Sequence, residues 1–266
     1  MKTFRKIFFT RFLIPTFCFV LGFRVTYATE LPTDSVREIS SRENINTSYR
    51  FEPRQFIVPG VLLAAGIAGV YTARGWKESV QNAISYESFD QSRIRIDEVL
   101  TYIPAAGYLT LGFIPGMPHR TDFRGRLMAG VTSYIVTVAT TELLKFGFHE
   151  RRPNSGNRDS FPSGHTARAF TGAELMRIEY GNLAGLGGYA FAVTVGALRM
   201  YNNRHWINDV IGGAAIGILS ARIGYWLLPL ERKLFGLDKR AGIALENLCI
   251  VPFAGKSFGL GMTMTF

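Results

Sequence analysis

The sequence predicts an all-α fold, a membrane-associated bundle of six helices, from two observations. Hydrophobic residues make up 47 % of the 266 residues, and the mean hydropathy of +0.12 is high for a soluble enzyme yet low for a protein wholly immersed in lipid. Apolar stretches also recur along the chain, and each is long enough for a helix. They lie at about residues 56–73, 97–115, 127–144, 166–180, 184–200 and 209–229.

The two ends of the chain differ in character from the part between them. Residues 1–28 place basic residues before an apolar stretch, the pattern of a signal peptide cleaved near Ala28 or of an uncleaved anchor helix. Residues 29–55 are polar, and we divide the rest into a helical domain at 56–230 and a tail at 231–266. Alternation in the tail sequence GLGMTMTF predicts a strand, and the tail is compatible with a short C-terminal β-hairpin.

The apolar segments are not equally suited to a membrane, where a crossing helix needs about twenty largely apolar residues. Segments 56–73 and 209–230 come near that standard and contain small residues that let helices approach closely. Segment 166–180 does not, because it carries the charged residues Arg168, Glu174, Arg177 and Glu179, which are costly when they face lipid. That helix is therefore either covered by the bundle or part of a soluble protein.

Two features of the sequence disagree on which side of the membrane each loop faces. Basic residues between the second and third segments and after the sixth mark cytoplasmic loops, which places the loops after the third and fifth segments outside. These residues are Arg120, Arg124, Arg126, Arg232, Lys233, Lys239 and Arg240. An exported N-terminus followed by six crossings would instead place the loops after the third and fifth segments on the cytoplasmic side. One segment then fails to span, or the bundle lies on the periplasmic side; the weakest segment is 97–115, which carries Pro104 and Pro115.

The charge balance favours an anionic partner. The formal net charge is +10 and the pI is about 9.8, which suits nucleic acid, an anionic membrane surface or a phosphorylated substrate. The sequence has no basic run, zinc-finger spacing or aromatic nucleic-acid motif, so we expect no nucleic-acid binding. Cys18 and Cys249 imply no disulfide framework.

Polar side chains that can carry chemistry gather in three stretches, KFGFHERRP from Lys145, PSGH from Pro162 and RMYNNRHWIND from Arg199. His205 and Asp209 are four residues apart and so share one helix face. The carboxylate can accept the ring Nδ1–H, fix the tautomer and leave Nε2 free as a nucleophile.

The other polar groups suit phosphoryl transfer, in which cations and amides stabilise charge on the transferred oxygens. The cations are Lys145, Arg152 and Arg199, while the Ser163 hydroxyl and the Gly164 amide supply neutral donors at a helix start. His165 is placed to protonate a leaving oxygen. A zinc site built from His149, His165, His205 and Asp209 is an alternative, which the nearby cations oppose.

These motifs, Lys145-x6-Arg152-Pro153, Pro162-Ser163-Gly164-His165 and Arg199-x5-His205-x3-Asp209, resemble the three-part signature of the type 2 phosphatidic acid phosphatase superfamily. The resemblance covers about residues 56–230 by helix count. It implies a helical bundle with a phosphatase site that needs no metal and no cofactor. One position departs from the pattern, because Leu198 stands where the superfamily usually has a serine, so one supporting hydrogen bond is missing.

The resemblance also implies residue roles. His205 forms a phosphohistidine intermediate and is oriented by Asp209, and His165 acts as the general acid and then assists water. The phosphate is held by Lys145, Arg152, Ser163, Gly164 and Arg199.

Several functions stay open at this point. We expect a membrane lipid phosphatase in the bacterial cell envelope, in the inner membrane with its active site facing the periplasm, and we place lipid A slightly ahead as substrate. Undecaprenyl pyrophosphate and phosphatidylglycerol phosphate are alternative substrates. A soluble periplasmic acid phosphatase, a vanadium haloperoxidase-like enzyme and a binding-only transporter or scaffold are alternative functions. The sequence leaves the oligomeric state open.

Overall fold

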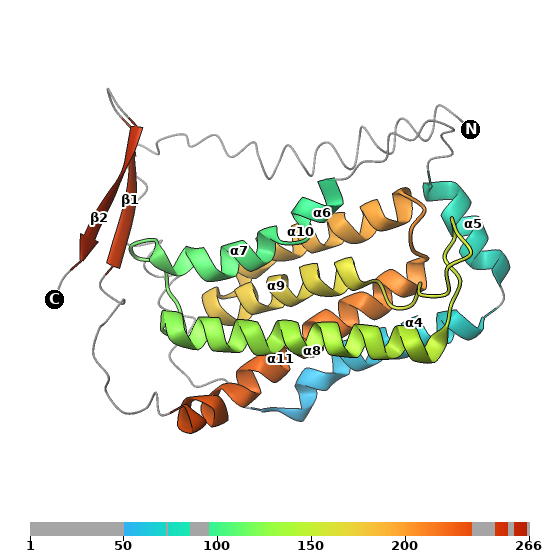
Figure 1. Cartoon of the computed structure of the whole chain (residues 1–266), viewed down its shortest axis with the longest axis horizontal. Coiled ribbons are helices and arrows are strands. Elements are labelled where there is room, and N and C mark those ends of the chain that lie inside the picture. The colour runs from blue at the N-terminus through green and yellow to red at the C-terminus, as the bar shows by residue number, and fades with distance from the viewer. Residues whose placement is uncertain (1–50, 73, 86–95, 236–247, 255–257, 265–266) are drawn as a thin grey trace.

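The computed structural model describes residues 51–72, 74–85, 96–235, 248–254 and 258–264 (Figure 1). The helical elements are η2 (Pro53–Phe56), α4 (Ile57–Tyr71), α5 (Arg74–Ile84), α6 (Ile96–Leu100), α7 (Ile103–Thr110), η3 (Leu111–Phe113), α8 (Phe123–Phe148), α9 (Gly164–Tyr180), α10 (Asn182–Tyr201) and α11 (Ile207–Leu234). Strands β1 (Leu248–Ala254) and β2 (Phe258–Met264) pair antiparallel, with Leu248 opposite Met264. The N-terminal segment interpreted as a signal peptide or anchor lies outside the described residues.

Helix α9 runs through the middle of the bundle and packs against α7, α8, α10 and α11 (Figure 1). Small residues let its neighbours come close. A Cβ on Gly217 of α11 would lie 2.4 Å from the Ala167 carbonyl oxygen, and one on Gly172 of α9 would lie 2.7 Å from the Ala105 nitrogen. Side chains at these two glycines would push the helices apart, so glycine sets the spacing around α9.

The acidic residues of α9, Glu174 and Glu179, are covered by the bundle, whereas Arg168 and Arg177 are half-buried. The Glu174 side chain is fully buried and accepts hydrogen bonds from Arg177 on its own helix, from Tyr189 on α10 and from Arg222 on α11. A buried carboxylate is tolerated when it is paired and hydrogen-bonded in this way. The polar sequence of segment 166–180 therefore reflects a helix enclosed by other helices.

The second apolar segment differs from the prediction of a single helix. Residues 97–115 divide among α6, α7 and η3, and Pro104 stands in the first turn of α7, where the missing proline N–H costs no hydrogen bond. Helix α5 was not predicted at all. The described residues therefore hold more helices than the predicted six; α6 and α7 are short, whereas α8 and α11 extend beyond the predicted segments.

Four helical stretches are long and apolar enough to cross a membrane: Pro53–Tyr71, Phe123–Phe148, Asn182–Tyr201 and Ile207–Leu234. Neither 97–115 nor 166–180 is among them. Large apolar side chains stand exposed on the outer faces of α4, α8 and α10, among them Ile57, Val61, Ile135, Leu143, Leu183 and Leu186. Apolar surfaces of this extent are expected where helices meet lipid, so the fold indicates a membrane protein.

Candidate active site

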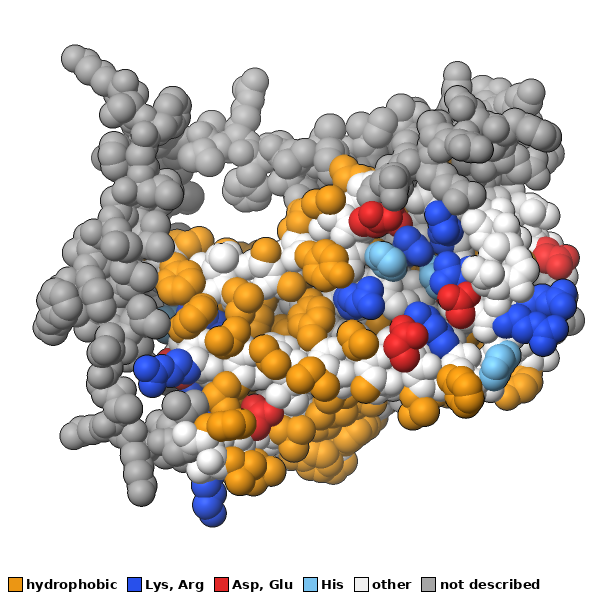
Figure 2. Space-filling model, in the orientation of Figure 1, with side chains coloured by type: hydrophobic (Ala, Val, Ile, Leu, Met, Phe, Trp, Pro, Cys, Tyr) orange, Lys and Arg blue, Asp and Glu red, His pale blue; other side chains and the backbone are white. Residues whose placement is uncertain are grey.

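The eight predicted site residues come from four parts of the chain that meet at one end of the bundle. They lie at the end of α8, in the loop and first turn that open α9, at the end of α10 and at the head of α11: Lys145, Arg152, Ser163, Gly164, His165, Arg199, His205 and Asp209. Figure 2 shows histidine, basic and acidic side chains gathered at one end of this face, beside a largely hydrophobic surface.

Backbone contacts fix how these segments meet. The Ser163 N–H donates to the Asp209 carbonyl oxygen at 3.0 Å, which ties the start of α9 to the head of α11. Lys145 Nζ lies 3.7 Å from the position that a Cβ on Gly164 would take, so this ammonium group stands beside the start of α9. Lys145, the loop before α9 and the His205 region therefore share one site.

Asp209 is held in place by its own helix. It occupies the third position of α11, and its Oδ2 accepts the backbone N–H of Trp206, the N-cap residue, at 2.8 Å. A carboxylate in the first turn is also favoured by the helix dipole. The same Oδ2 accepts the Ser160 hydroxyl at 2.5 Å, so a serine that the sequence interpretation missed anchors the carboxylate from the loop before α9.

The structure brings His205 and Asp209 together without the predicted hydrogen bond. His205 Nδ1 lies 3.4 Å from Asp209 Oδ2, and both side chains are at most 2 % exposed. Nδ1 has no hydrogen-bond partner among the described residues. The physical reason is that Oδ2 already accepts from Ser160 and Trp206. The carboxylate is close enough to stabilise an imidazolium.

Both site histidines have a pKa below the ordinary value of a histidine. Burial, reinforced by the positive charges of Arg199 and Arg152, holds the pKa of His205 well below its usual range. Burial and then the charge of Arg199 lower the pKa of His165 to about 4. A neutral imidazole has a free lone pair, so His205 is available as a nucleophile.

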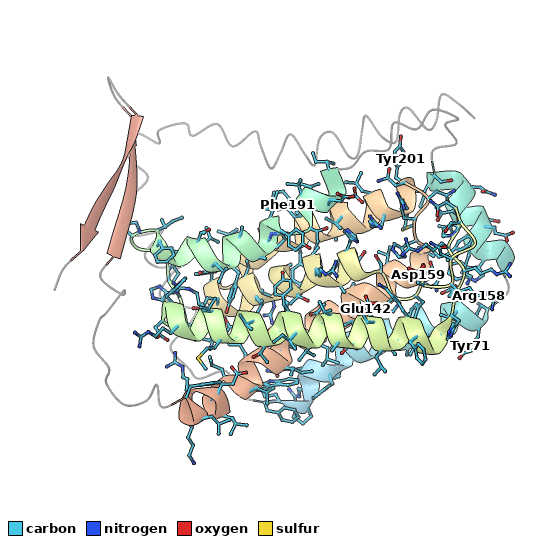
Figure 3. The ribbon with its side chains drawn as sticks, in the orientation of Figure 1. Tyr71, Glu142, Arg158, Asp159, Phe191 and Tyr201 are labelled. Atoms are coloured by element: carbon cyan, nitrogen blue, oxygen red, sulfur yellow. The ribbon has the colours of Figure 1, made fainter. Side chains whose placement is uncertain are left out.

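Each predicted phosphate-binding cation has a carboxylate partner. Lys145 Nζ lies 2.8 Å from Glu142 Oε1, and Arg152 makes two hydrogen bonds to Asp159 at 2.8 and 2.9 Å. Figure 3 labels Glu142 on α8 and Asp159 in the loop before α9. Arg199 Nη1 donates to Asp97 Oδ2 of α6 at 2.7 Å, and both side chains of this pair are buried. The three carboxylates occupy donors that phosphate oxygens would otherwise use.

Sequence interpretation missed several side chains at this end of the bundle. Asp97 and Ser160 carry no recognisable motif, and their contacts join positions 102 and 49 residues apart, so no local pattern could reveal them. Helix α5 had a usable signal, since Lys77, Gln81 and Ser85 recur every four residues and all three are buried.

The zinc alternative finds no support in the geometry. No group of three or more His, Cys, Asp or Glu side chains in the described ranges is arranged to hold a metal ion. His149, one of the four residues considered for that site, is exposed at the end of α8, where its ring packs 5.7 Å from that of Phe146.

Two histidines, a buried carboxylate and three cations thus gather at one end of a helical bundle. The family model described as the PAP2 superfamily matches residues 126–233, a range that contains all eight predicted site residues. Residues 126–233 therefore match the superfamily whose three-part signature the motifs resemble.

The chain is also similar to individual proteins. A lipid A 1-phosphatase of Porphyromonas gingivalis is 36 % identical over 200 residues, which cover 65 % of this chain and 44 % of that protein, so the match spans less than half of the relative. Among solved structures, LpxE from Aquifex aeolicus has a TM-score of 0.43 and 21 % identity, covering 55 % of this chain and 93 % of that one. A PAP2-type phosphatidylglycerolphosphate phosphatase from Bacillus subtilis also has a TM-score of 0.43, with 22 % identity, covering 70 % of this chain and 99 % of that one.

Proposed function

We propose that this chain is a phosphatase that removes phosphate from a membrane lipid, with His205 as the nucleophile. The observation that carries the proposal is the arrangement around His205, a buried neutral imidazole with the Asp209 carboxylate 3.4 Å from its Nδ1. Simple binding of phosphate requires no oriented imidazole, whereas nucleophilic catalysis does.

The reaction proceeds in two displacements. His205 Nε2 attacks phosphorus, the bond between phosphorus and the lipid oxygen breaks, and His165 donates its proton to that oxygen. Water then attacks the phosphohistidine and passes a proton to His165, the P–N bond breaks, and phosphate leaves. Asp209 stabilises the positive charge that develops on the His205 ring, while Lys145, Arg152 and Arg199 stabilise the phosphoryl oxygens together with Ser163 and Gly164.

His165 must be protonated to act as the acid, although its pKa is about 4 without substrate. A bound phosphate dianion brings two negative charges next to the ring, which favours the imidazolium and raises its pKa. Substrate binding therefore prepares the acid that the first step requires. The same dianion displaces the carboxylate partners of the three cations.

The preferred substrate is lipid A. The support is the lipid A 1-phosphatase of P. gingivalis, whose similarity extends over 65 % of this chain. The exposed apolar surfaces of α4, α8 and α10 suit a substrate that stays in the bilayer. We also propose a catalytic helical domain at residues 56–230 within the bacterial inner membrane.

Charge distribution supports an active site that faces the periplasm. Arg120 and Arg124 precede or open α8, and Arg232 and Lys233 lie in the last turn of α11. Lys145, at the other end of α8, and Asp209, at the other end of α11, belong to the site. Since basic residues favour the cytoplasmic side, this arrangement supports a site on the opposite side of the membrane.

The test is phosphate release by the purified chain from lipid A, undecaprenyl pyrophosphate, phosphatidylglycerol phosphate and p-nitrophenyl phosphate, with EDTA present. We expect release from lipid A by the wild type and none by His205→Ala, together with acid-labile labelling of the wild type by radioactive phosphate. Equal release by wild type and variant would rule out His205 as the nucleophile. Preference for another compound in the panel would replace lipid A as the substrate.

A further inference from the structure

Helix α5 buries a polar stripe, the reverse of an ordinary surface helix. Lys77, Gln81 and Ser85 are each about 4 % exposed, while Trp76 on the same helix is 42 % exposed. Burying polar groups costs free energy unless each finds a partner, so this helix is not explained by hydrophobic packing. Figure 1 shows α5 across the end of the bundle, beside the loop that leads into α9.

The partners of Lys77 and of the Gln81 amide nitrogen lie at the candidate active site. Lys77 Nζ donates to Glu150 Oε1 at 2.6 Å, in the loop between α8 and α9. Gln81 Nε2 donates to the Met200 carbonyl oxygen and to Asn203 Oδ1, both at 2.8 Å, in the segment between Arg199 and His205. Helix α5 therefore contacts two of the segments that carry site residues.

A continuous chain of hydrogen bonds leads from Lys77 to the carboxylate beside His205. Glu150 Oε2 accepts from Asn208 Nδ2 at 3.0 Å, and the second hydrogen on that nitrogen is directed to Asp209 Oδ1 at 3.2 Å. Asn208 and Asp209 are almost fully buried. Asp209 Oδ1 is thus held by an amide whose orientation depends on Glu150.

Lys77 also contacts the residue next to His205. Its Nζ lies 5.7 Å from the centre of the Trp206 ring, within the range of a cation–π interaction. The Trp206 indole N–H donates to the Arg151 carbonyl oxygen at 2.8 Å, and the Glu150 carbonyl oxygen accepts the Ser160 N–H at 3.0 Å. One ammonium group therefore supports both sides of the His205 and Asp209 pair.

Charge explains why a lysine stands at this position. The charged groups that face Glu150 are Lys77 from α5 and Asp209 from α11. Burial, followed by the negative charge of Asp209, raises the pKa of Glu150 to about 7, and the contact with Lys77 acts against this rise. Without Lys77, the Glu150 carboxylate would take up a proton. A carboxylate can only accept a hydrogen bond from Asn208, whereas the protonated group could also donate one.

We propose that Lys77 and Glu150 are positioning residues that orient the Asp209 carboxylate toward His205 through Asn208. The inference rests on the proposed function, since it concerns the same site. Lys77 lies outside residues 126–233, the part matched by the family model, so this chain supports its active site from an element beyond that region.

The experiment compares Lys77→Met, Glu150→Gln and the double variant with the wild type. The control is Glu78→Gln, which removes a charge from the exposed side of α5. We expect Lys77→Met to lower kcat on lipid A by about 10- to 100-fold, the scale of a misplaced catalytic group, with KM changed less than about twofold. We also expect the acid limb of its pH profile to move to higher pH, because Glu150 keeps its proton longer.

The double variant separates positioning from folding. Lys77→Met alone leaves a buried carboxylate without its cation, whereas Lys77→Met with Glu150→Gln leaves a neutral amide whose oxygen can still accept from Asn208. Relative to Lys77→Met, we expect the double variant to recover at least about a third of the lost kcat, measured on a logarithmic scale. We also expect the acid limb of its pH profile to return to the wild-type position. A Lys77→Met protein with wild-type kcat and pH profile would overturn the proposal, and so would a loss of activity that follows only the folded fraction.

Orthovanadate binding keeps this test independent of the proposed substrate. Vanadate occupies a phosphate site without turnover, and calorimetry measures its Kd. We expect Kd to rise about tenfold in Lys77→Met and to stay at the wild-type value in Glu78→Gln. If the wild type releases no phosphate from any substrate, the proposed function fails; unchanged vanadate binding in Lys77→Met would by itself refute the positioning role.

Discussion

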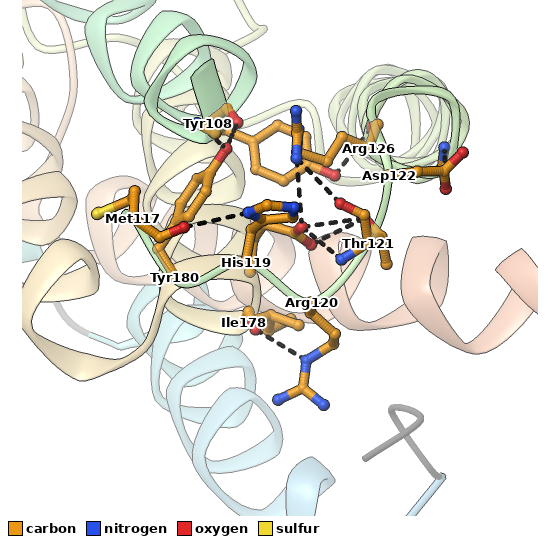
Figure 4. A network of polar contacts seen from close by, with 12 residues as sticks. Tyr108, Met117, His119, Arg120, Thr121, Asp122, Arg126, Ile178 and Tyr180 are labelled. Atoms are coloured by element: carbon orange, nitrogen blue, oxygen red, sulfur yellow. Dashed lines mark hydrogen bonds and ion pairs between the residues drawn. The ribbon is translucent and has the colours of Figure 1, made fainter. Parts of the chain in front are cut away.

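The two ends of α9 show opposite uses of buried polar groups. At its C-terminal end, the Glu179 carboxylate accepts from the Thr121 N–H at 2.7 Å, from the Thr121 hydroxyl at 3.0 Å and from the Tyr225 hydroxyl at 2.5 Å. Arg126 lies 3.8 Å away, and Tyr108 extends the network, part of which is drawn in Figure 4. Here nearly every polar atom has a partner within the protein.

At the N-terminal end of α9, the hydrogen bonding of buried polar atoms is less complete. His205 Nδ1, Arg199 Nε and Asn208 Oδ1 are buried without hydrogen-bond partners among the described residues, whereas only Arg126 Nε is in that position around Glu179. Buried polar atoms in native proteins are normally paired, and exceptions mark places where a ligand or a rearrangement supplies the bond. The comparison indicates that the Glu179 network stabilises the fold, whereas the unpaired atoms gather around His205, where we propose that phosphate binds.

The largest expected effect comes from Asp209→Asn. The amide can still accept the Trp206 N–H and keep α11 capped, yet it cannot stabilise a charged His205 ring. We expect kcat on lipid A to fall by about 10³-fold or more, with a melting temperature within a few degrees of the wild type. A kcat within about tenfold of the wild type would show that the carboxylate charge is not required.

Glu179→Gln is the matched change at the other end of α9. The change removes a buried negative charge, and the carboxylate oxygens that carry it accept hydrogen bonds from Thr121 and Tyr225. We expect the free energy of unfolding to fall by about 1–3 kcal/mol. The kcat of the folded protein should stay within about twofold of the wild type, because this end makes no contact with the site. A large loss of kcat in fully folded protein would contradict the separation of the two ends.

The sequence predicted the parts of the site that depend on local spacing. His205 and Asp209 do lie close together, but not on one helix face as predicted, because His205 precedes Trp206, the N-cap residue of α11. Ser163 stands at the N-cap position of α9, where its side chain makes no capping hydrogen bond. The bond from Arg199 to Asp97 and the bond from Lys77 to Glu150 join distant positions, so no period or motif could predict them. The break within 97–115 was partly foreseeable, since Pro104 and Pro115 had already marked that segment as the weakest.

The smallest expected effect tests whether the carboxylates at the site compete with phosphate. Asp97→Asn keeps an oxygen that can accept from Arg199 but replaces a charged hydrogen bond at 2.7 Å by a weaker neutral one. The change also removes a negative charge from the region that must receive a dianion. We expect inorganic phosphate to inhibit the variant about three to ten times more strongly than the wild type, which corresponds to roughly 1 kcal/mol. Glu98→Gln, an exposed change on the same helix, should leave the inhibition constant unchanged. Weaker inhibition in Asp97→Asn would instead mean that Asp97 is needed to hold Arg199 in its phosphate-binding position.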